Sequence, residues 1–251
     1  MITIRHADTL GTAHDGGQAL RCHFAFADYA DPAHGHEGRL RAVNACTLPA
    51  GAAYRIGPES AVDIVTWVAD GTLATAMDGF GPDALGAGGL HLAGTGSGCA
   101  QLAWRAGGQG ASFIQFWFLS DTQGTTPAQE ICPAMPELED GGFRILASGF
   151  PEDDPEEAER VSDGAPVTLS ARARLLHAAI PAGEGAAYGT APGRVLYLLA
   201  VSGAVWIGTQ GLHAGDAAAI SGQTDITVMA DEAAVVLLAD VAVQDDPMSC
   251  S

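Results

Sequence analysis

The chain has 251 residues, 47% of them apolar, and carries a formal net charge of −19 at pH 7. A chain of this length can bury a substantial apolar core, either as one large domain or as two domains of ordinary size. The acidic charge disfavours direct binding to nucleic acid and to anionic membrane surfaces, because the long-range electrostatic interaction is repulsive.

Five widely spaced cysteines include no C-x-x-C pair. This pattern indicates neither a disulfide framework nor a zinc knuckle, and it favours a reducing compartment. The N-terminal segment, residues 1–17, lacks the long apolar stretch of a secretory signal. No stretch approaches the roughly 18 uninterrupted apolar residues of a membrane span. We therefore expect a cytoplasmic protein that does not cross or bind a membrane.

Short apolar runs separated by Gly, Asp and Pro follow one another between Leu40 and Leu119. The 33 glycines and 13 prolines of the chain are scattered, as many short strands joined by tight turns require. Regular short strands with turn signals between them predict a β-sandwich or barrel. The predicted strands lie within residues 40–48, 61–68, 71–77, 88–94, 101–106 and 111–119.

The segment from Pro127 to Phe143 contains prolines and acidic residues, which suit a connector that crosses the surface. We therefore predict two domains, residues 1–137 and residues 138–251. The most strongly charged segment, residues 151–160, is expected to be a solvated loop or a short exposed helix.

A second block of predicted strands repeats the order of the first, with an apolar strand, a glycine turn, a short strand and a Gly-Asp turn. This order predicts two related barrels in tandem, and therefore an all-β protein. The strands of this block are predicted within residues 167–180, 194–208, 211–220, 225–230 and 234–243.

Several segments of the chain resemble, in order and spacing, the pirin family of bicupins. They include HFAFADYADPAH, DIVTWVADG, LAGTG and IQFWF, and the resemblance extends from about Arg21 to Pro127 and more weakly to Val241. It implies two cupin barrels, of the jelly-roll type, packed face to face. In typical members the N-terminal barrel holds iron or a similar divalent metal through His-x-His on one inner strand and His-x-Glu on another. Residues two apart on a strand point to the same face, so two such pairs can converge on one ion.

The resemblance places the metal-ligand positions on Gly57 and Glu59 and on Cys99 and Gln101. None of the four is histidine, and only Glu59 and Cys99 can supply an anionic ligand. Because metal sites commonly use three or four protein groups, we expect no metal and no other cofactor at this place. A few polar groups in an apolar chamber are instead typical of a pocket for a small molecule.

Asp63 is an additional candidate for this pocket, because it has the strand parity of Gly57 and Glu59. Four residues along a strand span roughly 13 Å, so Asp63 reaches an ion at Glu59 only if the strand bends or bulges. The alternative is that Asp63 hydrogen-bonds a neighbouring loop. The solitary His91, His177 and His213 are expected to be hydrogen-bonded structural groups.

Three functions follow from these observations. The first is a metal-free pirin-like bicupin that is non-catalytic or binds a small molecule in the N-terminal barrel. The second is a metal-dependent dioxygenase of the quercetin 2,3-dioxygenase type known in the family, which the altered ligand positions disfavour. The third is a protein-interaction or co-regulator role, which would act through a protein partner because the acidic charge disfavours direct contact with DNA.

Overall fold

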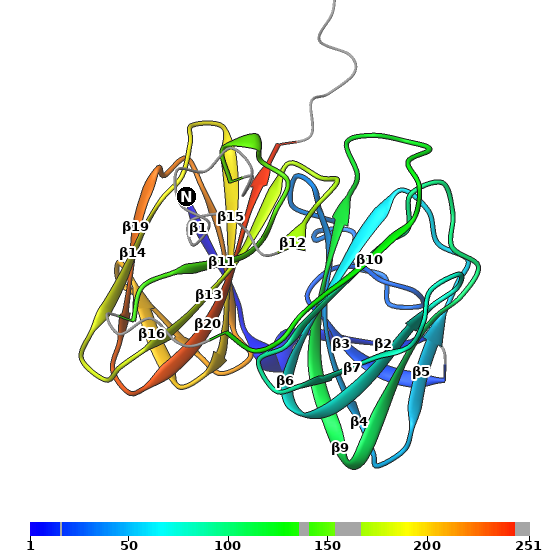
Figure 1. Ribbon diagram of the computed structural model, residues 1–251. Helices are drawn as coiled ribbons and strands as arrows, with labels where there is room; N and C mark the ends of the chain where they lie inside the picture. Colours follow the sequence, from blue (N-terminus) through cyan, green and yellow to red (C-terminus); the bar gives the residue numbers. More distant parts are fainter. Residues whose placement is uncertain (16, 136–140, 154–166, 244–251) are drawn as a thin grey trace, which may run out of the picture.

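The computed structural model describes residues 1–15, 17–135, 141–153 and 167–243, and it consists almost entirely of β-strands (Figure 1). Its strands form two barrels that stand side by side. The prediction of an all-β fold with tandem barrels is thereby confirmed. No helix in these described ranges is long and apolar enough to cross a membrane.

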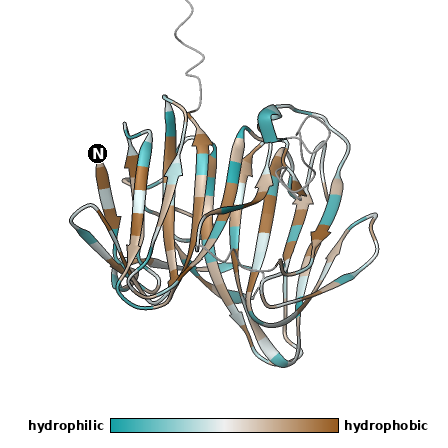
Figure 2. Ribbon diagram, turned by 60° about the vertical axis from the view of Figure 1, so that its left-hand side comes forward, coloured by the Kyte–Doolittle hydropathy of each residue, from teal (hydrophilic) through white to brown (hydrophobic). Residues whose placement is uncertain are grey.

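The first barrel is one antiparallel sheet with the strand order β10-β8-β6-β9-β4-β3-β2, to which β5 and β7 add at β9 and β6. The long strands β6 and β9 pair along most of their length and lie in the middle of this sheet. Apolar residues recur along the strands of both barrels (Figure 2). The strands are β2 (Gly11–Asp15), β3 (Gln18–Cys22), β4 (Leu40–Leu48), β5 (Ala53–Ile56), β6 (Val62–Met77), β7 (Asp83–Gly86), β8 (Leu90–Gly94), β9 (Leu102–Leu119) and β10 (Ala128–Cys132).

The second barrel combines a seven-stranded sheet, β1-β18-β15-β20-β13-β11-β12, with a four-stranded sheet, β14-β19-β16-β17. Its interior is filled by small and aliphatic side chains such as Leu196, Leu198 and Val236, all fully buried. The strands are β1 (Ile2–Arg5), β11 (Arg144–Ser148), β12 (Val167–Thr168), β13 (Ala173–Ile180), β14 (Gly185–Gly189), β15 (Arg194–Ser202), β16 (Ala204–Ile207), β17 (Gln210–His213), β18 (Ala217–Ser221), β19 (Asp225–Ala230) and β20 (Ala234–Ala242).

The N-terminal strand differs from the predicted division into residues 1–137 and 138–251. Strand β1, drawn in blue, lies in the barrel formed by the C-terminal half of the chain, where it pairs with β18 (Figure 1). Ile2 and Ile4 pack there against the core, so burial of these two side chains favours this position. The predicted boundary at residues 137 and 138 lies outside the described residues. The segment from Pro127 to Phe143, predicted to be a surface connector, contains strand β10, and this strand pairs with β8 at the edge of the first barrel.

Each barrel has its own apolar core, and a third apolar cluster lies between the two barrels. It includes Phe116 and Phe118 of β9 from the first barrel and Leu237 and Ala239 of β20 from the second. Polar contacts also cross this interface; for example, Nδ1 of the buried His23 lies 3.0 Å from the Tyr197 hydroxyl. Each large sheet is therefore apolar on both faces: one face fills its own barrel and the other packs against the neighbouring barrel.

The described part of the acidic segment is a short helix, which is one of the two predicted forms, but one of its residues is buried rather than exposed. Residues Pro151–Asp153 form a 3-10 helix, η2, in which Asp153 is buried. Its carboxylate accepts a hydrogen bond from Ser148 Oγ at 2.5 Å and pairs with Arg174 of β13. A buried carboxylate needs such partners, and the sequence of the segment did not reveal them. The remainder of this prediction, residues 154–160, lies outside the described residues.

Candidate functional site

Glu59 and Cys99 lie opposite each other although they are far apart in the sequence. They form a short antiparallel bridge, in which Glu59 N donates to Cys99 O at 2.9 Å and Cys99 N donates to Glu59 O at 2.8 Å. Cys99 is buried in the core of the first barrel, and Glu59 is half-buried. The structure thus brings together the two predicted site residues that can carry a negative charge.

Gly57 and Gln101, the other two predicted site positions, are both exposed. Gln101 is exposed, and its main-chain oxygen accepts a hydrogen bond from Cys99 Sγ at 3.2 Å. Gly57 is exposed and has φ +134°, and a Cβ atom added there would lie 2.3 Å from Ala100 O. A side chain at position 57 is therefore excluded unless the backbone moves.

A cavity of about 360 Å³ opens beside Glu59. It is lined by residues from the beginning of β6 and the end of β9, so it lies at one end of the first barrel. Asp15 also lines it, and its carboxylate accepts a hydrogen bond from the buried Tyr54 hydroxyl at 2.7 Å. Burial and, to a smaller extent, the charge of Asp15 raise the pKa of Glu59. Sequence analysis missed Asp15, because nothing in its local pattern distinguishes it from a turn residue.

Asp63 lies outside this cavity, which corrects the suggestion that it adds to the pocket and confirms the alternative that it hydrogen-bonds a neighbouring loop. Its buried carboxylate accepts hydrogen bonds from Ser170 N at 2.6 Å and from Ser170 Oγ at 2.9 Å, across the interface between the barrels. The parity argument fails because Ala61 has φ +54° and interrupts the extended chain before β6 begins. Asp63 therefore shares the face of Val65, which packs toward the second barrel.

A row of polar side chains crosses the interior of the first barrel. Asn44, Gln115, Thr66 and His91 are direct cross-strand neighbours on β4, β9, β6 and β8, and all four are fully buried. Neither ring nitrogen of His91 has a hydrogen-bond partner among the described residues, contrary to expectation. Burial lowers the pKa of His91 to about 4, so its ring is neutral at physiological pH. Polar residues at the inward positions of apolar strands were the available signal for this row.

The row yields a prediction for stability. The Thr66 hydroxyl is buried without a hydrogen-bond partner in the described structure, so Thr66→Val should leave the free energy of unfolding unchanged or raise it by up to about 1 kcal/mol. Thr95→Val is the matched control, because Thr95 Oγ1 accepts from Val62 N at 3.0 Å and donates to Val62 O at 2.8 Å. That variant should lose about 1–3 kcal/mol in urea unfolding. Equal losses in the two variants would show that Thr66 has a partner in solution.

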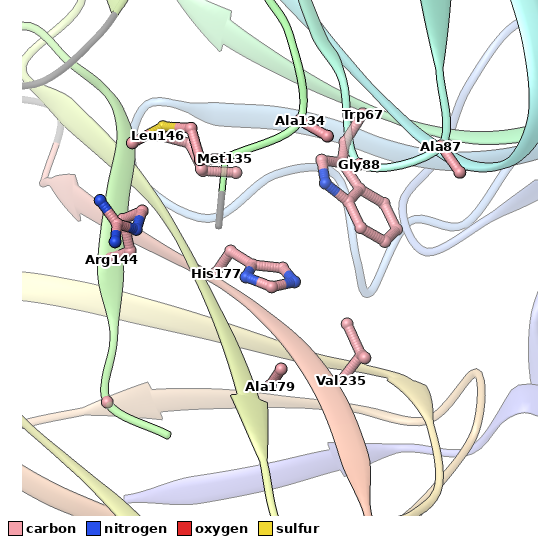
Figure 3. A pocket seen from close by; sticks show the side chains of 11 residues that line it. Trp67, Ala87, Gly88, Ala134, Met135, Arg144, Leu146, His177, Ala179 and Val235 are labelled. Carbon is pink, nitrogen blue, oxygen red and sulfur yellow. The ribbon is translucent and has the colours of Figure 1, made fainter. Parts of the chain in front are cut away.

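A second cavity, of about 300 Å³, lies between the barrels (Figure 3). The rings of Trp67 from β6 and His177 from β13 face each other across it, with their centroids 5.8 Å apart and a tilt of 35°. Arg144 of β11 also lines it. Its wall includes Met135 and Gly142, which flank residues outside the described ranges.

Two barrels of mainly antiparallel strands, packed through apolar faces and with a polar pocket at the end of the first, define a bicupin. The sequence profile of the quercetinase C-terminal cupin domain matches residues 160–241. A pirin-like protein of Caulobacter vibrioides is 30% identical over 243 residues, which cover 96% of this chain and 100% of that protein. The chain belongs to the pirin family of bicupins.

Two further comparisons agree with this assignment. Quercetin 2,3-dioxygenase of Escherichia coli K12 is 26% identical over 131 residues, which cover 52% of this chain and 57% of that protein. The crystal structure of the bacterial pirin YhhW from Escherichia coli, in complex with nickel(II), matches with a TM-score of 0.82 at 23% identity. That match covers 97% of this chain and 100% of the other, and it shows that the two proteins share the fold.

The residues at the corresponding site do not fit a transition-metal ion. Gly57 has no side chain and Gln101 is exposed, so Glu59 and Cys99 are the anionic donors that remain. Within the described part of the chain, no group of three or more His, Cys, Asp or Glu side chains is arranged to hold a metal. Three protein ligands are the usual minimum for a catalytic metal site.

Proposed function

We propose that this pirin-family bicupin binds a small organic molecule at the end of its N-terminal barrel, and that it does so without a tightly held transition metal. The observation that carries the proposal is the cavity at the end of the first barrel, which the carboxylates of Glu59 and Asp15 and the rings of Phe26 and Trp117 line. Glu59 is the one predicted ligand position in this lining. A few polar groups set in apolar walls are typical of small-molecule sites.

Metal analysis tests the first half of the proposal. We expect protein purified without a chelator to contain iron, nickel and zinc at clearly substoichiometric levels, because two anionic side chains do not compete well with water for these ions. The nickel-binding pirin of Escherichia coli, prepared in parallel, serves as a positive control. Stoichiometric metal that disappears in the Cys99→Ser variant would contradict the proposal.

A ligand-observed NMR screen of small fragments tests the second half. Fragments that bind the cavity should lose their signal in Ser60→Trp, in which a large ring at an exposed position of the lining fills the space. Thr227→Trp, at an exposed strand position of the second barrel, is the control for the added ring. Fragments that bind equally well to both variants would place the binding site elsewhere.

A metal-dependent dioxygenase of the quercetin 2,3-dioxygenase type is the second candidate. The name of the Escherichia coli relative favours it, and the donor set at Glu59 and Cys99 disfavours it. Turnover of quercetin that rises with added iron, nickel or manganese and stops with a chelator would support this function. A co-regulator role through a protein partner stays a prediction.

A further inference from the structure

The cavity at the end of the first barrel combines carboxylates with aromatic rings. Glu59 and Asp15 both line it, and the hydrogen bond from Tyr54 holds the Asp15 carboxylate in place. Phe26 and Trp117 also line it, and their rings meet edge to face with centroids 5.0 Å apart at an angle of 75°. Carboxylates and ring faces both attract organic cations.

Arg41 also lines the cavity, but its positive charge does not cancel the negative charges of Glu59 and Asp15. Its Nη1 donates hydrogen bonds to the main-chain oxygens of Ala25, at 2.7 Å, and Gly35, at 3.2 Å, so part of the guanidinium is committed to the neighbouring loop. Two carboxylates against one guanidinium leave the cavity with a net negative charge. The charge of −19 on the whole chain further raises the concentration of cations near its surface.

We propose, building on the small-ligand function above, that this cavity selects a small organic ammonium ion. The charged head lies toward Glu59 and Asp15, and the hydrocarbon part packs against Trp117 and Phe26. An inorganic cation uses the carboxylates but gains little from the rings, and a neutral molecule uses the rings but not the carboxylates. A volume of about 360 Å³ suits a compact ligand.

Three probes with the same tert-butyl body and different heads test the charge selection in the full chain. They are tert-butylammonium, tert-butanol and pivalate, titrated at low ionic strength and followed by saturation-transfer NMR. We expect tert-butylammonium to bind about tenfold more tightly than tert-butanol, and pivalate to bind most weakly. Glu59→Gln and Asp15→Asn should each weaken the ammonium and leave tert-butanol unchanged. Glu232→Gln, an exposed acid in the second barrel, is the matched control and should change neither.

The outcomes separate this inference from the function on which it rests. Equal or tighter binding of tert-butanol or pivalate would overturn the ammonium preference and leave the small-ligand function in place. Competition by Mg²⁺ at equal concentration that displaces the ammonium completely would overturn it in favour of an inorganic cation. No binding of any of the three probes would overturn it as well, while the fragment screen independently decides whether the cavity binds small molecules at all.

Discussion

Replacing Arg174 with methionine is expected to lower the free energy of unfolding by about 3–5 kcal/mol. Arg174 lies in the second barrel and is the centre of a buried ion network. Its Nη2 donates to Asp153 at 3.0 Å, its Nη1 donates to the Tyr188 hydroxyl at 3.2 Å, and the same Nη1 lies 3.5 Å from the carboxylate of the fully buried Asp240. Removing this cation leaves the buried carboxylates of Asp153 and Asp240 with too few positive charges and hydrogen-bond donors nearby.

Other contacts limit the loss to this range. Asp240 keeps hydrogen bonds from Tyr188 and Thr190, both at 2.7 Å, and from Arg194 at 3.3 Å. Methionine preserves most of the apolar volume of Arg174, although it loses the cation–π contact with the Phe150 ring, whose centroid lies 5.0 Å from the guanidinium carbon. The predicted effect is therefore electrostatic rather than a packing effect.

Urea unfolding, followed by circular dichroism, measures this loss. Arg55→Met is the control, because Arg55 is exposed, and it should stay within about 0.5 kcal/mol of the unmodified chain. The double variant Arg174→Met with Asp240→Asn should recover part of the stability, since it removes one uncompensated charge. A loss below about 1 kcal/mol for Arg174→Met would mean that water reaches the network.

Gly57→Ala should destabilise the chain by at least about 1 kcal/mol more than Gly98→Ala. Both glycines have φ in a region that L-residues rarely adopt, +134° for Gly57 and +144° for Gly98, so each substitution costs about 1–3 kcal/mol in backbone strain. They differ in the space around the new atom. A Cβ at Gly57 meets Ala100 O at 2.3 Å, whereas a Cβ at Gly98 meets nothing within 4 Å.

The crowding around Gly57 also bears on whether a histidine at this position could bind a metal. Histidine at position 57 carries the same strain and the same collision, so Gly57→His by itself should lower stability without creating nickel affinity. Thermal unfolding of the two alanine variants measures the collision at position 57, and thermal unfolding of Gly57→His with and without nickel measures any metal affinity. Equal destabilisation by Gly57→Ala and Gly98→Ala would show that this loop relaxes easily and that the position can accept a side chain.

The sequence by itself determined the all-β class, the family and the longer strands of both barrels, but not short strands such as β5, β7 and β14. Alternating apolar residues and turn residues identified both barrels, because the side-chain period of a strand is local and survives without tertiary information. The motif spacing also placed Glu59 and Cys99 at matching positions, and the structure has them opposite each other. Both results depend on patterns within short segments.

Only the tertiary structure decided which polar groups share a pocket. Asp63 lies outside the predicted site because Ala61 has a left-handed conformation, so residues before and after Ala61 do not alternate between the two faces as one continuous strand would. Asp15 lines the pocket and Asp153 is a buried partner of Arg174 because the fold brings together segments that are distant in sequence. Strand β1 likewise joined the second barrel because the open edge of β18 was available there. Local patterns report which face of a strand is buried, but the partner of a buried charge is set by the packing of the whole chain.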